Sequence, residues 1–239
     1  MRALSHFLTS MWAHDATLSV FLVLLVGIVF FLLPLADYQQ AAIVGANLMA
    51  GLLVISGGMA LIDRAWARRA VVLLVLSLVV AAWAQTIVEV RGLSVVAAIL
   101  TVLVLALLML LLLVDVYRPG PITRYRISGA VAAYVLLGLT WSYVYALVEM
   151  GAPGSLRFPT DGATPVSQPH LPAKLFYFSA ATLTTVGYGD VVPVAPLARS
   201  LAMLEAICGQ LFLATLIARL VSLRQPSPTR RPAEPRSGE

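Results

Sequence analysis

The residues of this chain best suited to chemistry lie in the segment 184–190, which reads Thr-Thr-Val-Gly-Tyr-Gly-Asp. A cation that leaves water needs replacement oxygens at similar distances, and backbone carbonyls provide them if several consecutive ones point the same way. Such alignment requires some residues with positive φ, which glycine adopts without steric cost. Gly187 and Gly189 alternate with Val186 and Tyr188, whose side chains we expect to point into the surrounding protein. The alternation therefore allows consecutive backbone carbonyls to line one edge of this glycine segment.

The composition indicates a protein embedded in a membrane. Hydrophobic residues make up 60% and charged residues 11% of the 239 positions, whereas about a quarter of an ordinary soluble domain is charged. The net charge of +5 comes with a single lysine, Lys174, and no basic stripe with interleaved aromatics, so no nucleic-acid partner is expected. The histidines are scattered, Cys208 is the single cysteine, and the sequence has no nucleophile–base pair, metal cluster or cofactor loop. We therefore expect neither an enzyme nor a bound cofactor.

Apolar runs long enough to cross a membrane recur along the chain. About 20 consecutive apolar residues in a helix span the ~30 Å hydrocarbon core. Six runs meet this requirement, at residues 17–35, 41–62, 70–88, 93–114, 128–150 and 197–223. The first run also leaves open a signal peptide cleaved after Ala36. The fold class predicted from these runs is an all-α membrane protein with six transmembrane helices.

A shorter helix precedes the glycine segment. Residues 151–171 form an exposed loop rich in Pro, Gly, Ser and Thr. Pro172 is well placed as the first residue of a helix that continues over residues 173–184. A dozen residues are too few to cross the membrane, and this helix leads directly into the glycine segment. The pattern predicts a re-entrant pore helix and loop between the fifth and sixth transmembrane helices, where the loop lines a cavity.

The basic residues are distributed unequally between the two sides of this predicted topology. Twelve lie on the side of both termini and four on the other side, so the positive-inside bias predicts a plasma-membrane protein with cytoplasmic N- and C-termini. The chain then divides into a cytoplasmic N-terminus (1–16), a four-helix transmembrane domain (17–116), a cytoplasmic linker (117–127), a pore domain (128–223) and a disordered cytoplasmic tail (224–239). Arg219 and Arg224 can snorkel to the inner headgroups, and an anionic-lipid site there is the alternative.

The glycine segment, lying between two membrane-length helices, resembles the TVGYG selectivity filter of tetrameric potassium channels. The resemblance covers residues 128–223 and implies that K⁺ is the permeant ion. The ion-coordinating positions it implies are Thr185, Val186, Gly187 and Tyr188, and the supporting positions are Thr184, Gly189, Asp190, Tyr177 and Phe178. One such loop cannot enclose an ion, so a homotetramer is implied.

The supporting positions have distinct expected roles. Gly189 and Asp190 close the outer mouth, and the pore-helix aromatics Tyr177 and Phe178 brace the filter tyrosine, as the resemblance implies. Some relatives place a carboxylate four residues before the filter threonine, where it pairs with the filter aspartate. Ala181 occupies that position here, so this pairing is unavailable.

The layout of six helices resembles the subunit of the voltage-gated superfamily but lacks its sensor. A voltage sensor needs arginines at every third residue of its fourth helix, each worth about 2.3 kcal/mol per 100 mV. Steps of three from Arg91 meet Ser94, Ala97 and then only uncharged residues as far as Asp115. We therefore predict no gating by a charged sensor. The first four helices are expected to form a packing collar, and a lipid or tension sensor is the alternative.

Two residues of the last helix could take part in gating. Gly209 resembles the hinge glycine of the family, and close packing against a neighbouring helix is the alternative. Glu205 is an ionisable residue within a membrane helix, which is a functional hypothesis by default. Its alternative is a structural hydrogen bond to the pore helix, for instance to Thr182 or Thr184.

These observations favour a potassium-selective channel subunit that passes ions passively down their gradient. A weakly selective cation channel on the same scaffold is one alternative, although Tyr188 is intact and argues against it. A regulatory membrane subunit with a silent pore is the other.

Overall fold

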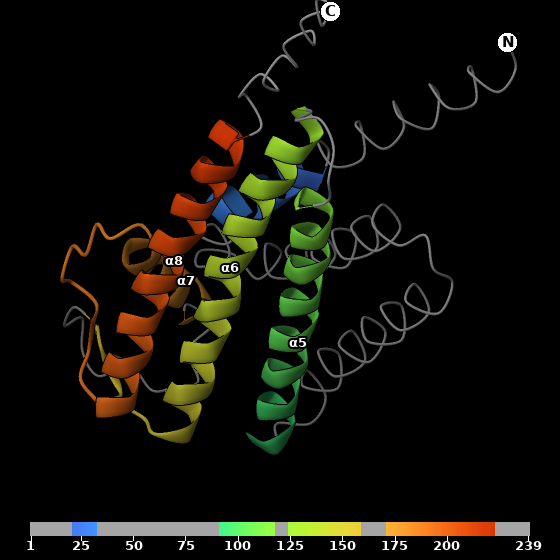
Figure 1. The fold of residues 1–239 in the computed structure, drawn as a ribbon. Helices are drawn as coiled ribbons and strands as arrows, with labels where there is room; N and C mark the ends of the chain where they lie inside the picture. The colour runs from blue at the N-terminus through green and yellow to red at the C-terminus, as the bar shows by residue number, and fades with distance from the viewer. Residues whose placement is uncertain (1–20, 33–90, 118–123, 159–170, 223–239) are drawn as a thin grey trace, which may run out of the picture.

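Three long helices run side by side and dominate the structure. The computed structural model describes residues 21–32, 91–117, 124–158 and 171–222. The long helices are α5 (Arg91–Val116), α6 (Arg124–Gly151) and α8 (Pro196–Ser222). The direction of α5 and α8 is opposite to that of α6 (Figure 1). Among the described residues, these three helices alone are long and apolar enough to cross a membrane. A mostly helical fold with three candidate membrane-spanning helices is thus confirmed.

The helix ends agree with the sequence prediction to within a few residues. The predicted runs 93–114, 128–150 and 197–223 correspond to α5, α6 and α8. The largest difference is at the start of α6, which begins at Arg124. The helices predicted at 41–62 and 70–88 lie outside the described residues, as do the two terminal segments, Ala36 and most of the linker 117–127. The count of six helices and the division into domains therefore stay predictions.

Hydroxyl groups within the long helices bond back to their own backbone. The hydroxyl of Thr101 donates to the Ala97 carbonyl at 2.8 Å, and that of Thr140 donates to the Leu136 carbonyl at 2.7 Å. Such bonds satisfy a polar group that has no water to bind in an apolar setting. These polar residues therefore leave the helices apolar enough to span.

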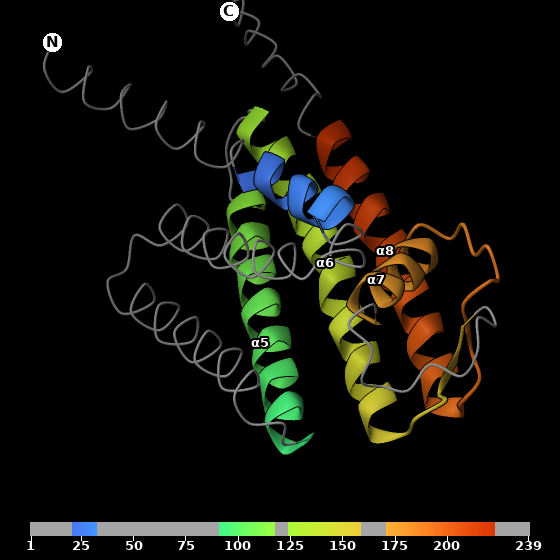
Figure 2. The ribbon, with the colours of Figure 1, turned by 180° about the vertical axis from the view of Figure 1, so that it is seen from behind.

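Residues 21–32 form a helix that crosses α5 and α6 (Figure 2). Its last turn is the π-helical η1 (Ile28–Leu32). This helix is part of an apolar core that we call the α5 cluster. Its buried members are Phe21, Leu25, Val29, Val104, Leu105, Leu108, Leu112, Ala132, Ala133, Leu136 and Phe176. Burial of these side chains joins the crossing helix, α5, α6 and, through Phe176, α7 into one packed unit.

The short helix α7 (Leu171–Leu183) packs against both α6 and α8. Its apolar face lies in a second core, the α7 cluster, whose buried members are Tyr145, Ala146, Leu156, Leu175, Phe178 and Val191. Two short strands complete this region: β1 (Leu156–Arg157) pairs antiparallel with β2 (Val192–Pro193). The strand pair joins the chain just after α6 to the chain just after the glycine segment. The sequence predicted only loops at both places.

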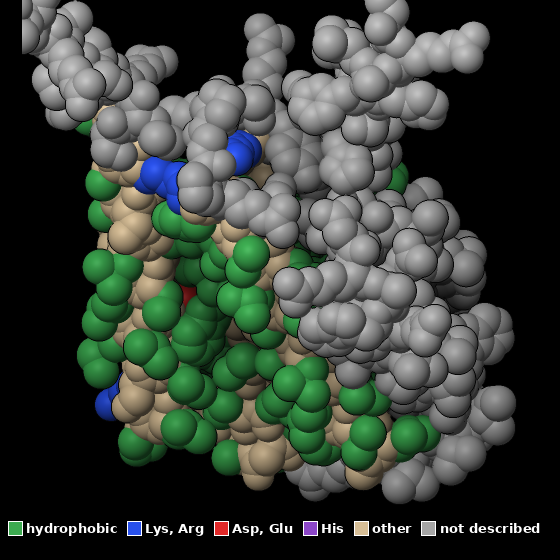
Figure 3. Space-filling model, turned by 45° about the vertical axis from the view of Figure 1, so that its right-hand side comes forward, with side chains coloured by type: hydrophobic (Ala, Val, Ile, Leu, Met, Phe, Trp, Pro, Cys, Tyr) green, Lys and Arg blue, Asp and Glu red, His purple; other side chains and the backbone are tan. Residues whose placement is uncertain are grey.

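Much of α8 remains uncovered in the single chain. Large hydrophobic side chains are exposed along its length, namely Leu197, Met203, Leu204, Ile207, Leu211, Leu213, Ile217 and Val221. Hydrophobic side chains also cover most of the described surface seen in Figure 3. Exposed apolar surface of this extent is typical of contact with lipid or with another protein.

Candidate functional site

The glycine segment hangs from the last turn of α7. The amide of Thr184 donates to the Ala180 carbonyl at 3.0 Å, which continues the helix by one bond. The Ala181 carbonyl then accepts from two amides, Val186 at 2.9 Å and Gly187 at 3.1 Å. One carbonyl oxygen has two lone pairs, so both bonds can form together. The first half of the segment is therefore fixed to the position and rotation of α7.

Positive φ angles alternate along the segment. Gly187 has φ +56° and Gly189 has φ +82°, as the sequence predicted for the glycines. Thr185 also has a positive φ, of +58°. Such a value is a genuine outlier for a β-branched residue and costs roughly 1–3 kcal/mol. The sequence gives no signal for this strain, because residue type alone argues against a left-handed threonine.

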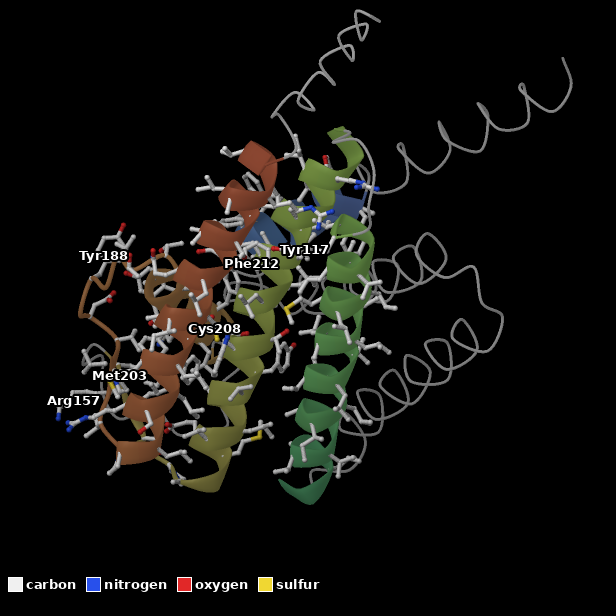
Figure 4. The ribbon with its side chains drawn as sticks, in the orientation of Figure 1. Tyr117, Arg157, Tyr188, Met203, Cys208 and Phe212 are labelled. Carbon is white, nitrogen blue, oxygen red and sulfur yellow. The ribbon has the colours of Figure 1, made fainter. Side chains whose placement is uncertain are left out.

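The segment is exposed in the single chain. Residues 184–190 are all exposed, with 53% of the Val186 surface and 71% of the Tyr188 surface accessible. Tyr188 lies on the loop that projects beyond α8 (Figure 4). The expected burial of these two side chains in the surrounding protein is thus not provided by one chain.

Tyr177 and Phe178, the two aromatic residues predicted to brace Tyr188, contact different partners. Tyr177 stacks on Tyr188, with ring centroids 6.0 Å apart and ring planes 7° from parallel. Phe178 is buried instead, and it packs edge-on against Tyr145 of α6 at 4.9 Å. Consecutive helical residues point in directions about 100° apart, so one can face the glycine segment while the other faces α6. Within the chain, only Tyr177 of this pair contacts the tyrosine of the segment.

Asp190 has a partner even though Ala181 offers no carboxylate. The Tyr177 hydroxyl interacts with the Asp190 carboxylate, and this interaction lowers the pKa of Asp190 below its ordinary value. The same interaction raises the pKa of Tyr177. Asp190 also accepts a bond from the Val191 amide at 2.9 Å. The aromatic side chain of α7 thus orients both Tyr188 and Asp190.

Glu205 of α8 lies fully buried behind α7. The Tyr145 hydroxyl donates to Glu205 Oε2 at 2.5 Å, and Ser179 Oγ lies 2.5 Å from Glu205 Oε1. The expected bond to the short helix before the glycine segment is therefore present, but the suggested partners Thr182 and Thr184 were wrong. The Thr184 hydroxyl instead donates to the Ala180 carbonyl at 2.7 Å. Sequence reasoning missed Ser179 because nothing local fixes the rotation of α8 against α7.

The other residue singled out in α8, Gly209, packs against the end of α7. A methyl group at Gly209 would collide with the backbone carbonyl of Leu183, so only glycine fits at this contact. The packing interpretation is therefore supported, and the hinge stays a prediction. The next residue, Gln210, approaches Thr185, with Nε2 3.4 Å from Oγ1. Gln210 is a site residue that the sequence did not reveal.

The chain on the far side of the glycine segment is also tied to α6. Glu149, buried near the end of α6, accepts bonds from the amides of Gly154 at 2.6 Å and Leu156 at 3.1 Å. The Ser155 carbonyl accepts from the amide of Val194 at 2.8 Å. Together with the β1–β2 pairing, these bonds hold the far end of the glycine segment to the end of α6.

At the end of α5, Tyr117 reaches α8. Its hydroxyl donates to Thr215 Oγ1 at 3.2 Å, and the guanidinium of Arg219 lies 4.6 Å from its ring centroid. Arg224, the other predicted headgroup-facing arginine, lies outside the described residues.

Within the part of the chain that the structure describes, no group of three or more His, Cys, Asp or Glu side chains could hold a metal ion.

Comparison with known proteins gives matches to part of the chain. A family described as "Ion channel" matches residues 133–225, which include most of α6, all of α7, the glycine segment and α8. The Inward rectifier potassium channel Kirbac3.1 of Paramagnetospirillum magnetotacticum is 48% identical over 54 residues, or 23% of this chain. The match spans about a fifth of that relative, 18% of its length. No solved structure matches the chain. These matches support an ion-channel protein.

Proposed function

We propose that the chain is one subunit of a homotetrameric channel that conducts K⁺ passively, with residues 184–190 as its selectivity filter. The observation that carries the proposal is the alternating positive φ at Thr185, Gly187 and Gly189. Strained backbone of this kind persists where the surrounding structure imposes it, and it clusters at ligand clamps. The Ion channel family match and the similarity to an inward rectifier potassium channel support the same function.

The exposure of the filter favours four subunits around one axis. One loop cannot surround an ion, and its side chains remain accessible in the single chain. Lipid could cover the apolar surface of α8, but lipid would not accept the exposed polar groups of Thr184, Thr185 and Asp190. Neighbouring subunits would cover the apolar surface of α8, and a water-filled axis lined by copies of the filter would receive the polar groups. Tyr177 and Gln210 would then hold each filter from behind.

The position of α7 supports a re-entrant pore helix. Its 13 residues are only about 20 Å long, less than the ~30 Å hydrocarbon core. Packing of α7 against α6 and α8 would bury it inside the protein, where such a short helix is tolerated. With the predicted cytoplasmic termini, the filter would lie at the outer face of the plasma membrane.

Gating by a charged voltage sensor is not part of this proposal. The membrane span of α5, from Gly92 to Val114, contains no lysine or arginine. Without charge to move, the membrane potential does no work on this helix. A conductance curve as steep as that of a sensor-bearing channel would refute this part of the proposal.

The direct test is ion flux from the purified full-length protein in liposomes. We expect K⁺ efflux that barium blocks and a reversal potential in mixed salts that follows K⁺ rather than Na⁺. Equal permeability to the two ions would instead show a weakly selective cation channel. No flux at all would show a silent subunit and overturn the proposal.

Two glycine variants provide a matched pair for this assay. An added Cβ meets no atom within 4 Å at either Gly187 or Gly151, but only Gly187 has a positive φ. Gly187→Ala should therefore abolish selective flux, because the left-handed conformation costs alanine about 1–2 kcal/mol. Gly151→Ala should conduct as the wild type does.

A further inference from the structure

The hydrogen-bond contacts of Ser179 bear on the protonation state of the Glu205 carboxyl group. Ser179 Oγ lies 2.8 Å from the carbonyl oxygen of Gly138 and 2.5 Å from Glu205 Oε1. A serine hydroxyl carries one proton, and a carbonyl oxygen can only accept. The serine proton therefore goes to Gly138, and the short contact with Glu205 needs a second proton. A protonated carboxyl group would supply that proton and donate to Ser179.

The surroundings of Glu205 agree with a neutral acid. Its side chain is fully buried, and neither hydrogen-bond partner of its carboxyl group carries a positive charge. A buried carboxylate without a cation is costly, whereas a hydrogen-bonded carboxylic acid is not. The titratable groups that face it, Tyr145 and Tyr134, both come from α6. The α7 residue that faces it is Ser179, which does not titrate, and the nearest titratable residue along α8 is Cys208.

The resulting chain of bonds joins three helices behind the filter. The Tyr145 hydroxyl of α6 donates to Glu205 of α8, Glu205 contacts Ser179 of α7, and the Ser179 hydroxyl contacts the Gly138 carbonyl of α6. With Glu205 as the neutral acid, its carboxyl proton would go to Ser179 and the serine proton to Gly138. Two residues after Ser179, the Ala181 carbonyl holds the filter amides of Val186 and Gly187. The rotation of α7 about its axis therefore determines where these amides lie.

We propose that Glu205 is a positioning residue held as the neutral acid, and that its proton completes the bond chain that fixes α7 and, through α7, ion selectivity. The proposal rests on the channel function proposed above. Loss of this proton at alkaline pH would leave Ser179 with two acceptors and one proton. Selectivity is then expected to fall as pH rises, without any change in the filter residues themselves.

Substitution of Glu205 separates the neutral acid from the carboxylate. In Glu205→Gln the amide nitrogen can donate to Ser179 while the amide oxygen accepts from Tyr145, so the bond chain survives. This variant should keep the K⁺/Na⁺ flux ratio of the wild type at neutral pH and lose its alkaline decline. Glu205→Leu, of similar size but without polar atoms, should lower the ratio about tenfold because Ser179 of α7 loses its hydrogen-bond partner on α8. A Gln variant as defective as the Leu variant would overturn the proposal.

Ser179 offers a second set of variants. Ser179→Ala removes the hydroxyl that links Glu205 to Gly138, whereas Ser179→Thr keeps a hydroxyl at the same place. We expect Ser179→Ala to lower the flux ratio about fivefold and Ser179→Thr to restore most of it. Equal ratios in the wild type and Ser179→Ala would also contradict the proposal.

Infrared spectroscopy tests the proton without reliance on ion flux. The full-length wild type at neutral pH should show the carbonyl stretch of a protonated carboxylic acid that is missing in Glu205→Gln. Absence of this difference band would overturn the neutral acid even if the protein conducts K⁺. A difference band in a protein that passes no K⁺ would uphold the neutral acid and its bond chain, and the failure would then belong to the proposed channel function.

Discussion

The α5 cluster is held together by apolar packing, whereas the region around α7 also depends on buried hydrogen bonds. In the α5 cluster, the crossing helix 21–32, α5 and α6 meet through aliphatic and phenylalanine side chains. Around α7, apolar packing is supplemented by buried polar groups, namely Tyr145, Ser179, Glu205 and Glu149. Hydrophobic burial depends on area and volume, whereas a buried polar network depends on the placement of each atom.

This difference suggests different tolerances. An apolar core accepts other side chains of similar volume with modest loss of stability. A buried polar network specifies one arrangement, because an unpaired member costs about 1–3 kcal/mol. The α5 cluster should therefore govern whether the chain folds, and the α7 region should govern which ion passes.

The largest expected effect is on the stability of the α5 cluster. Leu108 is 1% exposed within it, and Leu108→Ala should reduce the free energy of unfolding by about 2–5 kcal/mol through lost burial and a cavity. The K⁺/Na⁺ flux ratio of the protein that remains folded should not change. Thermal unfolding in detergent and flux in liposomes measure the two quantities. Leu110→Ala, on the same helix but 55% exposed, is the control and should change stability little. A changed flux ratio in Leu108→Ala would show that the α5 cluster affects ion selection as well as folding.

A smaller loss of stability, with a loss of selectivity, is expected at Gly209. The side chain of Gly209→Ala would meet the Leu183 carbonyl, and backbone at the end of α7 moves with difficulty. Overpacking of this kind typically costs about 1–3 kcal/mol. Gly138→Ala is the matched control, because its nearest neighbour would be a Phe176 side-chain atom at an ordinary 3.5 Å. Wild-type unfolding temperature and flux ratio in Gly209→Ala would show that the contact with α7 is not rigid.

Sequence reasoning was most successful where the determinant is local. The lengths of apolar runs located α5, α6 and α8, because a membrane span has a minimum length. The positive φ of Gly187 and Gly189 followed from residue type. Pro172 indicated the start of α7 to within one residue, since α7 begins at Leu171.

Features set by contacts between distant segments were not predictable. The bond between Glu205 and Ser179 joins residues 26 apart in the chain, and it depends on the rotation of two helices. The strained φ of Thr185 is imposed by its neighbours rather than by its own preference. The pairing of β1 with β2 involves strands of two residues, too short to show an alternating pattern. Sequence patterns therefore located the elements of the site but not the atoms that orient them.

An effect limited to acid pH is expected from Tyr177. The bond from Tyr177 keeps the Asp190 pKa below its ordinary value, so the ionised form persists to lower pH. The stabilisation from this carboxylate is present above the ordinary pKa and is lost as pH falls through the lowered value. In Tyr177→Phe the pKa should return toward its ordinary value, and K⁺ flux should decline at a higher external pH than in the wild type. Flux titrated from pH 7 downward measures the midpoint. Tyr143→Phe is a control that should not move it.

The smallest expected effect is at Tyr117, where α5 makes polar contacts with α8. The Tyr117 hydroxyl bonds Thr215, and the ring lies beneath the Arg219 guanidinium. An exposed cation–π contact is worth about 0.5–1 kcal/mol, and a neutral hydrogen bond contributes about 0.5–1.5 kcal/mol net. Tyr117→Ala removes both and should lower stability slightly, while Tyr117→Phe removes only the hydrogen bond. Neither variant should change the flux ratio, since α7 and the filter are untouched.

For the Tyr117 variants, the rates of channel opening and closing are the more informative measurement. If the α5 cluster influences conduction at all, this contact is where α5 touches the helix proposed to line the pore. Loosening it in Tyr117→Ala should therefore change the rates of opening and closing in single-channel recordings, with Tyr117→Phe intermediate. Unchanged rates in both variants would mean that the α5 cluster contributes only to folding. Ion conduction would then depend on the region around α7, which is proposed to select the ion.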